Sequence, residues 1–205
     1  MDKDRDAVIV SALRTPFGRY GGSMRDIDYY DLGAIPMKDV MSRVNLDPAS
    51  GIVDEVFWGV GDTSQTKDVY TPVAARQSLI KAGLPPTTPS ISFDKACVSA
   101  MSAVKMAATS IGLGEIDTAI AGGATSFSRE PLILRDLRFG GFRIGDVKLE
   151  DPLFELGYDD FNPVSVDTDD VAFEYGIDRL EQDEWAARSH INYGTPGMLV
   201  SSRMR

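Results

Sequence analysis

Cysteine and histidine are almost absent from this chain of 205 residues. Cys97 is its only cysteine and His190 its only histidine. A single thiol excludes an intrachain disulfide, and cysteine usage of this kind is typical of a reducing compartment. Chemistry that needs a nucleophilic thiol or an imidazole therefore depends on one residue of each type.

Basic residues are also in short supply, with 21 lysines and arginines against 31 acids and a net charge of −10. This balance argues against a broad nucleic-acid surface. No apolar run approaches the length that spans a membrane. Residues 1–6 are charged and lack the patterns of a signal or transit peptide. We therefore expect a protein of the cytoplasm or an organelle matrix, with no nucleic-acid partner and no membrane span.

Strand and helix patterns alternate through the first 126 residues, which predicts an α/β fold with a mostly parallel sheet and crossover helices. The predicted strands cover residues 7–11, 53–60, 89–93 and 118–121. The predicted helices cover residues 30–44 and 72–82, followed by one that begins near Cys97 and ends near Gly112 or Gly114. Thr71 is the expected N-cap of helix 72–82, and Gly83 follows its end.

The pattern changes after residue 126. Residues 129–170 are irregular, regular pattern returns at 171–175, and residues 179–191 predict a helix with Asp178 as its N-cap. Long irregular insertions of this kind usually serve as lids, binding loops or interfaces. We therefore divide the chain into an α/β domain (1–126), a partial, irregular and helical loop domain (127–194) and an atypical tail (195–205).

Cys97 follows a predicted strand and precedes a run of small, helix-forming residues at 100–110. The thiol is thus expected at a helix N-terminus, where the helix dipole and free N–H groups favour the nucleophilic thiolate. The sequence around it allows a covalent role, while an inert buried cysteine is the alternative. Because the following helix carries almost no charge, we expect both of its sides to be packed in the interior.

Four segments, in order and with matching spacing, resemble motifs of the thiolases. Residues 8–18 resemble the opening signature of the family, and residues 94–100 resemble its nucleophile motif N-x-x-C-x-S-G. Residues 121–128 resemble the following G-G-x-E-x-M-S motif, and residues 178–190 resemble a helix of the family's loop domain. The resemblance covers the chain from about Asp6 to Gly194.

The resemblance implies a fold and an activity. Thiolases consist of two similar α/β halves with a loop domain inserted in the first, and this chain corresponds to the N-terminal half. The implied function is that of an acyl-CoA C-acyltransferase, in which Cys97 becomes acylated and the enolate of a second acyl-CoA attacks the thioester, or the reverse. Acyl-CoA and CoA are then substrates, no metal or other cofactor is needed, and the full-length family forms homo-oligomers.

Three positions depart from the family pattern. Asp94 stands where the family has asparagine, and a carboxylate near the thiol disfavours its thiolate if it points inward. Ala100 replaces a glycine, which is expected to narrow the pocket. Residues 165–167 replace an H-M-G-like segment of the loop domain. These departures concern the subfamily and the substrate more than the fold.

The family completes its site with a histidine and a second cysteine from its second half, and this chain contains neither. His190 lies at a position that the family does not use for catalysis. We therefore expect this chain alone to be inactive in full condensation or thiolysis. The alternative is a truncated, non-catalytic homologue that acts by association with a full-length partner. For residues 195–205 we hypothesise a frameshift, which the DNA beyond codon 194 tests.

Several other features have ordinary structural explanations. We favour Arg14 as an ion-pair or interface residue, Gly122–Gly123 as a bend, and the acids between 167 and 174 as a solvated face or helix cap. The basic residues of the insertion are left open between contacts with CoA phosphates and pairing with neighbouring acids: Arg135, Arg138, Arg143 and Lys148.

Overall fold

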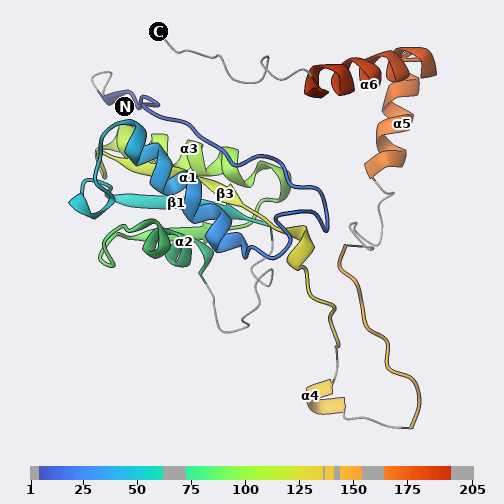
Figure 1. Cartoon of the computed structure of the whole chain (residues 1–205), viewed down its shortest axis with the longest axis horizontal. Coiled ribbons are helices and arrows are strands. Elements are labelled where there is room, and N and C mark those ends of the chain that lie inside the picture. Colours follow the sequence, from blue (N-terminus) through green and yellow to red (C-terminus); the bar gives the residue numbers. More distant parts are fainter. Residues whose placement is uncertain (1–4, 62–72, 136, 141–143, 154–163, 195–205) are drawn as a thin grey trace. The chain divides into compact units, whose positions relative to one another are not determined.

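The computed structural model describes residues 5–61, 73–135, 137–140, 144–153 and 164–194 (Figure 1). It divides into two compact units, Met1–Leu153 and Phe154–Arg205, which are described separately. The atypical tail at 195–205 and its hypothesised frameshift lie outside the described residues, as do Thr71 and the first residue of the helix predicted at 72–82.

The first unit is built on a parallel sheet. Among the described residues, its strands are β1 (Glu55–Val60), β2 (Ser90–Phe93) and β3 (Ala119–Ala124), in the order β2-β1-β3. Val56 of β1 aligns with Ser90 of β2 on one side and with Ile120 of β3 on the other. Consecutive parallel strands need crossover connections, so this arrangement confirms the predicted α/β class.

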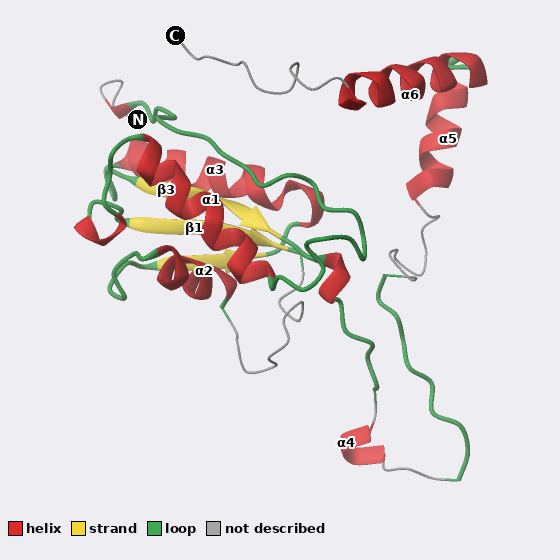
Figure 2. Cartoon of the chain, in the orientation of Figure 1, coloured by secondary structure: helices red, strands yellow, loops and turns green. Residues whose placement is uncertain are grey.

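Helices cover both faces of the sheet (Figure 2). The helices α1 (Tyr29–Arg43) and α2 (Ala74–Ala82) pack against each other and on one face, whereas α3 (Ser99–Leu113) packs on the other face. Short 3-10 turns, η2 (Pro48–Ser50) and η4 (Phe127–Arg129), lie in the connections. The helix predicted at 30–44 is confirmed as α1.

Side chains that alternate along β1 divide the core into two layers. Val56, Trp58 and Val60 face the larger layer, and Phe57 faces the layer under α3. The larger layer is completed by residues of α1, α2 and the loops around them, among them Tyr29, Met37, Met41, Leu79 and Leu84. The smaller layer contains Ala103 and Ala107, whose short side chains bring α3 close to the sheet.

Glycines set the closest approaches in this packing. A Cβ at Gly59 of β1 would lie 2.5 Å from the Cβ of Ser99, so the first turn of α3 rests directly on the strand. A Cβ at Gly122 would lie 2.6 Å from the indole ring of Trp58. The strand β3 continues through Gly122 and Gly123, so these glycines make room for neighbours and do not form the bend we expected.

The prediction of a strand at residues 7–11 is wrong. This segment is not part of the sheet, and Val8, Ile9 and Val10 are 77%, 71% and 74% exposed. Just before it, Arg5 donates hydrogen bonds to the carbonyls of Ile111 and Ile116 at the end of α3. A β-branched run becomes a buried strand only where a neighbouring strand bonds its backbone, and the described residues provide no such neighbour.

The helix ends agree better with the sequence. Gly83 follows α2 and Gly114 follows α3, both in the left-handed region at φ 93° and 76°. Each glycine donates its N–H to a carbonyl of the last helical turn. Pro36 lies inside α1 without ending it.

The interior position predicted for α3 is only half right. Ala103 and Ala107 are buried against the sheet, but Met101 and Val104 on the opposite side are 68% and 43% exposed. The stretch Ala96–Leu113 is apolar and long enough to cross a membrane by composition alone. In this fold it packs on the sheet instead, which leaves an apolar outer face on α3.

Among the described residues, the insertion contains the helix predicted at 179–191 and two helices that its sequence did not predict. In the first unit, α4 (Leu137–Gly140) lies between the two residues of an antiparallel bridge, Ile133 and Glu150. The second unit contains α5 (Val164–Glu174) and α6 (Arg179–Gly194). Because α5 buries no side chain, it carries no apolar stripe from which residues 164–170 could be predicted as helical.

The predicted start of α6 is confirmed. The carboxylate of Asp178 accepts a hydrogen bond from the N–H of Glu181 at 2.9 Å, and the N–H of Asp178 donates to the carboxylate of Glu181 at 3.1 Å. This reciprocal pair is a capping box. One turn further on, the Asp183 carboxylate beside Arg179 raises the pKa of that guanidinium above its ordinary value.

The close seat of α3 on β1 predicts the effect of adding one methyl group. We expect Gly59→Ala to lower the free energy of unfolding by about 2 kcal/mol, because the new Cβ would overlap the backbone of Ser99 and Ala100. Gly61→Ala is the matched control, since its nearest neighbour is the side chain of Thr125 at 3.3 Å. Urea denaturation measures both, and equal losses would contradict this packing.

The hydrogen bonds of the Asp54 carboxylate lead us to expect that the stability of the fold depends on pH. The carboxylate accepts hydrogen bonds from the N–H groups of Asp117 and Thr118 at 2.8 and 2.9 Å, which hold its pKa below the ordinary 3.8. A carboxyl whose pKa is lower in the folded chain than in the unfolded chain stabilises the fold at pH values above the unfolded pKa. This contribution disappears as the pH falls through the folded pKa.

We therefore expect Asp54→Ala to lower the free energy of unfolding by about 1 kcal/mol at pH 7, a value discounted for solvent exposure. The loss should be smaller at pH 3, which lies below the ordinary pKa of 3.8, because the contribution of the charged carboxylate declines as the pH falls. Asp39→Ala, an exposed site on α1, is the control and should change stability little at either pH. A loss for Asp54→Ala that does not depend on pH would argue against the charged acceptor.

Candidate functional site

Cys97 lies in the 3-10 turn η3 (Ala96–Val98) that connects β2 to α3. Its side chain is exposed, in contrast to the alternative of an inert buried cysteine. The turn follows the carboxyl end of β2, and in open α/β sheets ligands bind outside the carboxyl ends of the strands. The structure thus places the thiol just before the helix and at the edge of the sheet where chemistry is expected.

The turn before Cys97 has a strained backbone held by side chains. Ala96 adopts φ 49°, a left-handed conformation that costs an L-residue about 1 kcal/mol. The Asp94 carboxylate accepts a hydrogen bond from the N–H of Ala96 at 2.7 Å. The Ser99 hydroxyl accepts one from the N–H of Lys95 at 2.7 Å and donates one to the carbonyl of Ala96 at 2.8 Å. The turn is therefore fixed from both ends.

The environment of the thiol supplies orientation but no base. Within the part of the chain that the structure describes, no hydrogen bond reaches the Cys97 sulfur. His190 lies on α6, in the second unit, and its side chain is exposed. The free N–H groups and the dipole at the start of α3 favour negative charge on the sulfur. Among the described residues, no base is hydrogen-bonded to the thiol.

The glycine-rich end of β3 lies beside the start of α3. A Cβ at Gly123 would be 2.6 Å from the carbonyl oxygen of Gly59 and 3.4 Å from the methyl of Ala100. The methyl of Ala100 therefore faces β3. The extra carbon of Ala100 therefore occupies space beside Gly123. Through this contact, the motif at residues 121–128 approaches the turn that carries Cys97.

The loop before α1 is tied to the end of β3. The N–H of Gly21 donates to the hydroxyl of Ser128 at 3.0 Å. Arg129 forms an ion pair of 2.8 Å with Asp28, which is almost fully buried and also accepts a hydrogen bond from the hydroxyl of Tyr30. The loop that follows the opening signature is therefore held to the end of the glycine motif, although the two are more than 100 residues apart.

Among the described residues, Arg14 does not form the ion pair that was one of its two expected roles, and the interface role stays a prediction. Its guanidinium lies 3.3 Å from the centroid of the Phe17 ring, a cation–π contact. It forms no ion pair with any residue in the described ranges. Both residues belong to the exposed segment that precedes α1, so the contact stabilises that loop locally.

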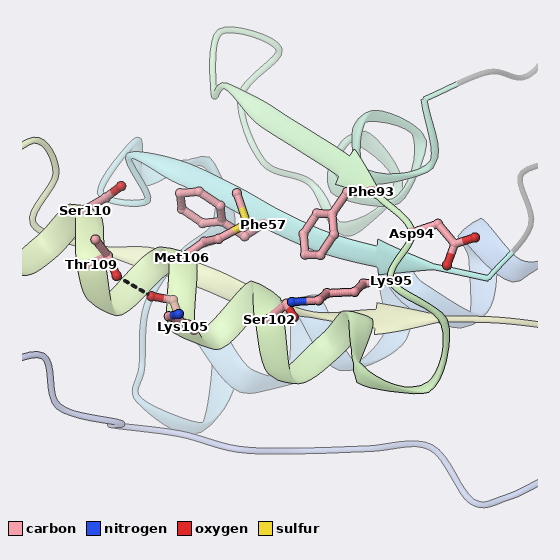
Figure 3. A pocket seen from close by; sticks show the side chains of 9 residues that line it. All are labelled: Phe57, Phe93, Asp94, Lys95, Ser102, Lys105, Met106, Thr109 and Ser110. Atoms are coloured by element: carbon pink, nitrogen blue, oxygen red, sulfur yellow. Dashed lines mark hydrogen bonds between the residues drawn. The ribbon is translucent and has the colours of Figure 1, made fainter.

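A groove of about 430 Å³ runs along α3 from the turn at residues 94–95 (Figure 3). Phe57, Phe93 and Met106 form its apolar floor, and its polar lining consists of Asp94, Lys95, Ser102, Lys105, Thr109 and Ser110. In Figure 3 the Lys95 side chain extends along the groove toward Ser102. Cys97 does not line the groove. It lies on the same connection between β2 and α3 as Asp94 and Lys95, which do.

The insertion's charged residues are partly accounted for. Arg135 pairs with Glu150 at 2.6 Å, which is one of the two alternatives left open for it. Arg143 lies outside the described residues. The acids Asp167, Asp169, Asp170 and Glu174 are exposed along α5, as are residues 165–167. Among described residues, no group of three or more potential ligands is placed to hold a metal ion.

Sequence reasoning found the nucleophile candidate but missed what holds it. Ser99 was read only as part of a motif, although a serine at a helix start is a known signal for bonds to nearby backbone groups. The left-handed Ala96 had no signal, because alanine is not a residue that favours this conformation.

Comparisons with known proteins agree with the motifs. Residues 7–195 match the family described as Thiolase, N-terminal domain. An acetyl-CoA acetyltransferase of Cupriavidus necator is 40% identical over 187 residues, which are 90% of this chain and 46% of that protein. A probable acetyl-CoA acyltransferase of Staphylococcus aureus is 35% identical over 185 residues, 89% of this chain and 45% of that protein.

Solved structures give the same result. The acetyl-CoA acetyltransferase of Bacillus anthracis superposes with a TM-score of 0.79 at 30% identity, covering 91% of this chain and 46% of that one. Human mitochondrial 3-ketoacyl-CoA thiolase in complex with CoA superposes with a TM-score of 0.78 at 31% identity, covering 88% and 45%. The chain spans about half the length of these relatives. It belongs to the thiolase family, whose N-terminal domain it carries.

Proposed function

We propose that the protein is an acyl-CoA C-acyltransferase of the thiolase type in which Cys97 carries the acyl group as a thioester. The observation that supports this most is the exposed thiol at the start of α3, inside a segment that resembles the family's nucleophile motif. The names of the relatives, acetyl-CoA acetyltransferase and acetyl-CoA acyltransferase, favour the same substrate class. The family uses CoA substrates without a metal or other cofactor.

The proposed chemistry is two transfers of an acyl group. The Cys97 thiolate attacks the thioester carbonyl of an acyl-CoA, the sulfur of CoA leaves with its electron pair, and the acyl group stays on Cys97. A second acyl-CoA, having lost a proton next to its carbonyl, attacks this thioester as an enolate. A carbon–carbon bond forms and Cys97 leaves as thiolate. Thiolates are good nucleophiles and good leaving groups near neutral pH, which suits both steps.

The fold supports the first of these steps. Hydrogen bonds to Lys95 and Ala96 hold the backbone of the turn directly before Cys97, and the start of α3 favours negative charge on its sulfur. The first turn of α3 packs directly on Gly59 of β1. Cys97 lies just before this turn and is exposed, so a CoA thioester can reach its sulfur. Proximity and orientation of this kind are a large part of catalysis by acyl transfer.

The second step needs groups that these 205 residues do not contain. Removal of a proton from the second acyl-CoA requires a base, and the sequence holds one histidine and no second cysteine. We propose that a region homologous to the other half of the relatives supplies them, on the same polypeptide or on another. We expect the full-length form to be a homo-oligomer, in the cytoplasm or an organelle matrix.

A second candidate is a non-catalytic homologue that acts by associating with a full-length thiolase. The exposed side of α3 favours it, because Met101 and Val104, one turn apart on the helix, are apolar and 68% and 43% exposed. Exposed apolar side chains that gather on a surface are typical of an interface. Acylation of Cys97 distinguishes the two candidates.

Acylation is testable with this chain alone. Incubation with acetyl-CoA should add one acetyl group per chain, detected by intact mass spectrometry, and Cys97→Ser should abolish the gain. No acetoacetyl-CoA should form, because the enolate step lacks its base. A wild-type chain that gains no mass would leave the non-catalytic candidate, and condensation by the chain alone would contradict the division of the site.

The apolar face of α3 predicts association. The isolated chain should form oligomers or aggregates that sedimentation and light scattering detect, and Met101→Gln with Val104→Gln should shift it toward smaller species. Ile35→Gln on α1 is the control, since Ile35 is similarly exposed on the opposite side of the sheet. A wild-type chain that stays monomeric at high concentration would count against the prediction.

A further inference from the structure

The connection between β2 and α3 contains an acidic side chain whose position has two consequences for Cys97. The carboxylate of Asp94 accepts a hydrogen bond of 2.7 Å from the N–H of Ala96, the residue directly before Cys97. Asp94 and the neighbouring Lys95 both line the groove along α3, and the Lys95 side chain extends toward Ser102, away from the Asp94 carboxylate (Figure 3). Asp94 forms no ion pair with any residue in the described part of the chain.

The first consequence is mechanical. Ala96 has φ 49°, and an alanine stays in this left-handed region only where its surroundings hold it there. Ser99 holds the turn from the α3 side, through the N–H of Lys95 and the carbonyl of Ala96. Asp94 holds it from the β2 side. Removing the acceptor at position 94 leaves the N–H of Ala96 without this bond and frees the backbone on which Cys97 sits.

The second consequence is electrostatic. The Asp94 carboxylate lies in the same turn as the sulfur, and a nearby negative charge disfavours reaction of the sulfur as an anion. The start of α3 acts in the opposite direction. Asp94 therefore holds the backbone next to Cys97 and at the same time places a carboxylate in the turn that carries the sulfur.

We propose that Asp94 is a positioning residue for Cys97 that holds the nucleophile's turn through the N–H of Ala96 and restrains the sulfur's reactivity through its charge. This inference rests on the proposed function, in which Cys97 is the nucleophile. Its two parts are separable, because asparagine keeps the hydrogen-bond acceptor and removes the charge, whereas alanine removes both.

The test uses Asp94→Asn, Asp94→Ala and the control Asp39→Asn, which removes an exposed charge on α1. Because Cys97 is the only cysteine, alkylation by iodoacetamide reports on it alone and needs no acyl-CoA. The result is thus independent of whether the chain forms an acyl-enzyme. Urea denaturation of each variant measures how much the hydrogen bond to Ala96 contributes to the free energy of unfolding.

At neutral pH and low salt we expect Asp94→Asn to be alkylated about threefold faster than the wild type, and the difference to shrink at high salt. Asp39→Asn should react at the wild-type rate. Asp94→Ala should unfold at lower urea than Asp94→Asn, and this difference should shrink when Ala96→Gly is added, because glycine adopts the left-handed turn unaided.

Two results would overturn the proposal. Equal alkylation rates for Asp94→Asn and the wild type would show that the charge of the carboxylate does not affect the reactivity of the sulfur. Equal stability of Asp94→Asn and Asp94→Ala would show that the hydrogen bond does not hold the turn. Failure of the acylation experiment with acetyl-CoA would leave both of these measurements unaffected, so the two proposals fail separately.

Discussion

The absence of a side chain at Gly59 is the constraint on which the site depends. It lets the first turn of α3 lie against the central strand, with Ser99 where a Cβ would otherwise be. The same serine then bonds to the backbone of residues 95 and 96 and closes the turn that carries Cys97. A backbone contact in the sheet thus determines where a thiol is presented two residues outside the helix.

The chain carries an exposed thiol on a turn that is held by hydrogen bonds, within the N-terminal domain of a thiolase. The turn, the helix start and the parallel sheet all lie within the first unit. The 205 residues contain one histidine and no second cysteine, and Met101 and Val104 on α3 are exposed. Both facts agree with relatives that are about twice as long.

Much of the first unit could be predicted from its sequence, because its elements bury periodic apolar side chains and end at glycines such as Gly83 and Gly114. Cys97 could be predicted from the motif around it. The errors have physical causes. The β-branched run at 7–11 had the composition of a strand but no neighbour, and α5 had no buried face to give it a periodicity. The left-handed Ala96 runs against its residue type and depends on Asp94 and Ser99, which only the structure brings together.

The exposed segment at residues 7–11 has a further consequence for handling the molecule. Its three consecutive β-branched or aliphatic side chains lie outside the sheet, and its backbone N–H and C=O groups lack strand partners among the described residues. Segments of this composition are templates for cross-β pairing between molecules. Pairing of this segment with a second molecule is therefore a route to association separate from the exposed side of α3, and it would leave the turn that carries Cys97 untouched.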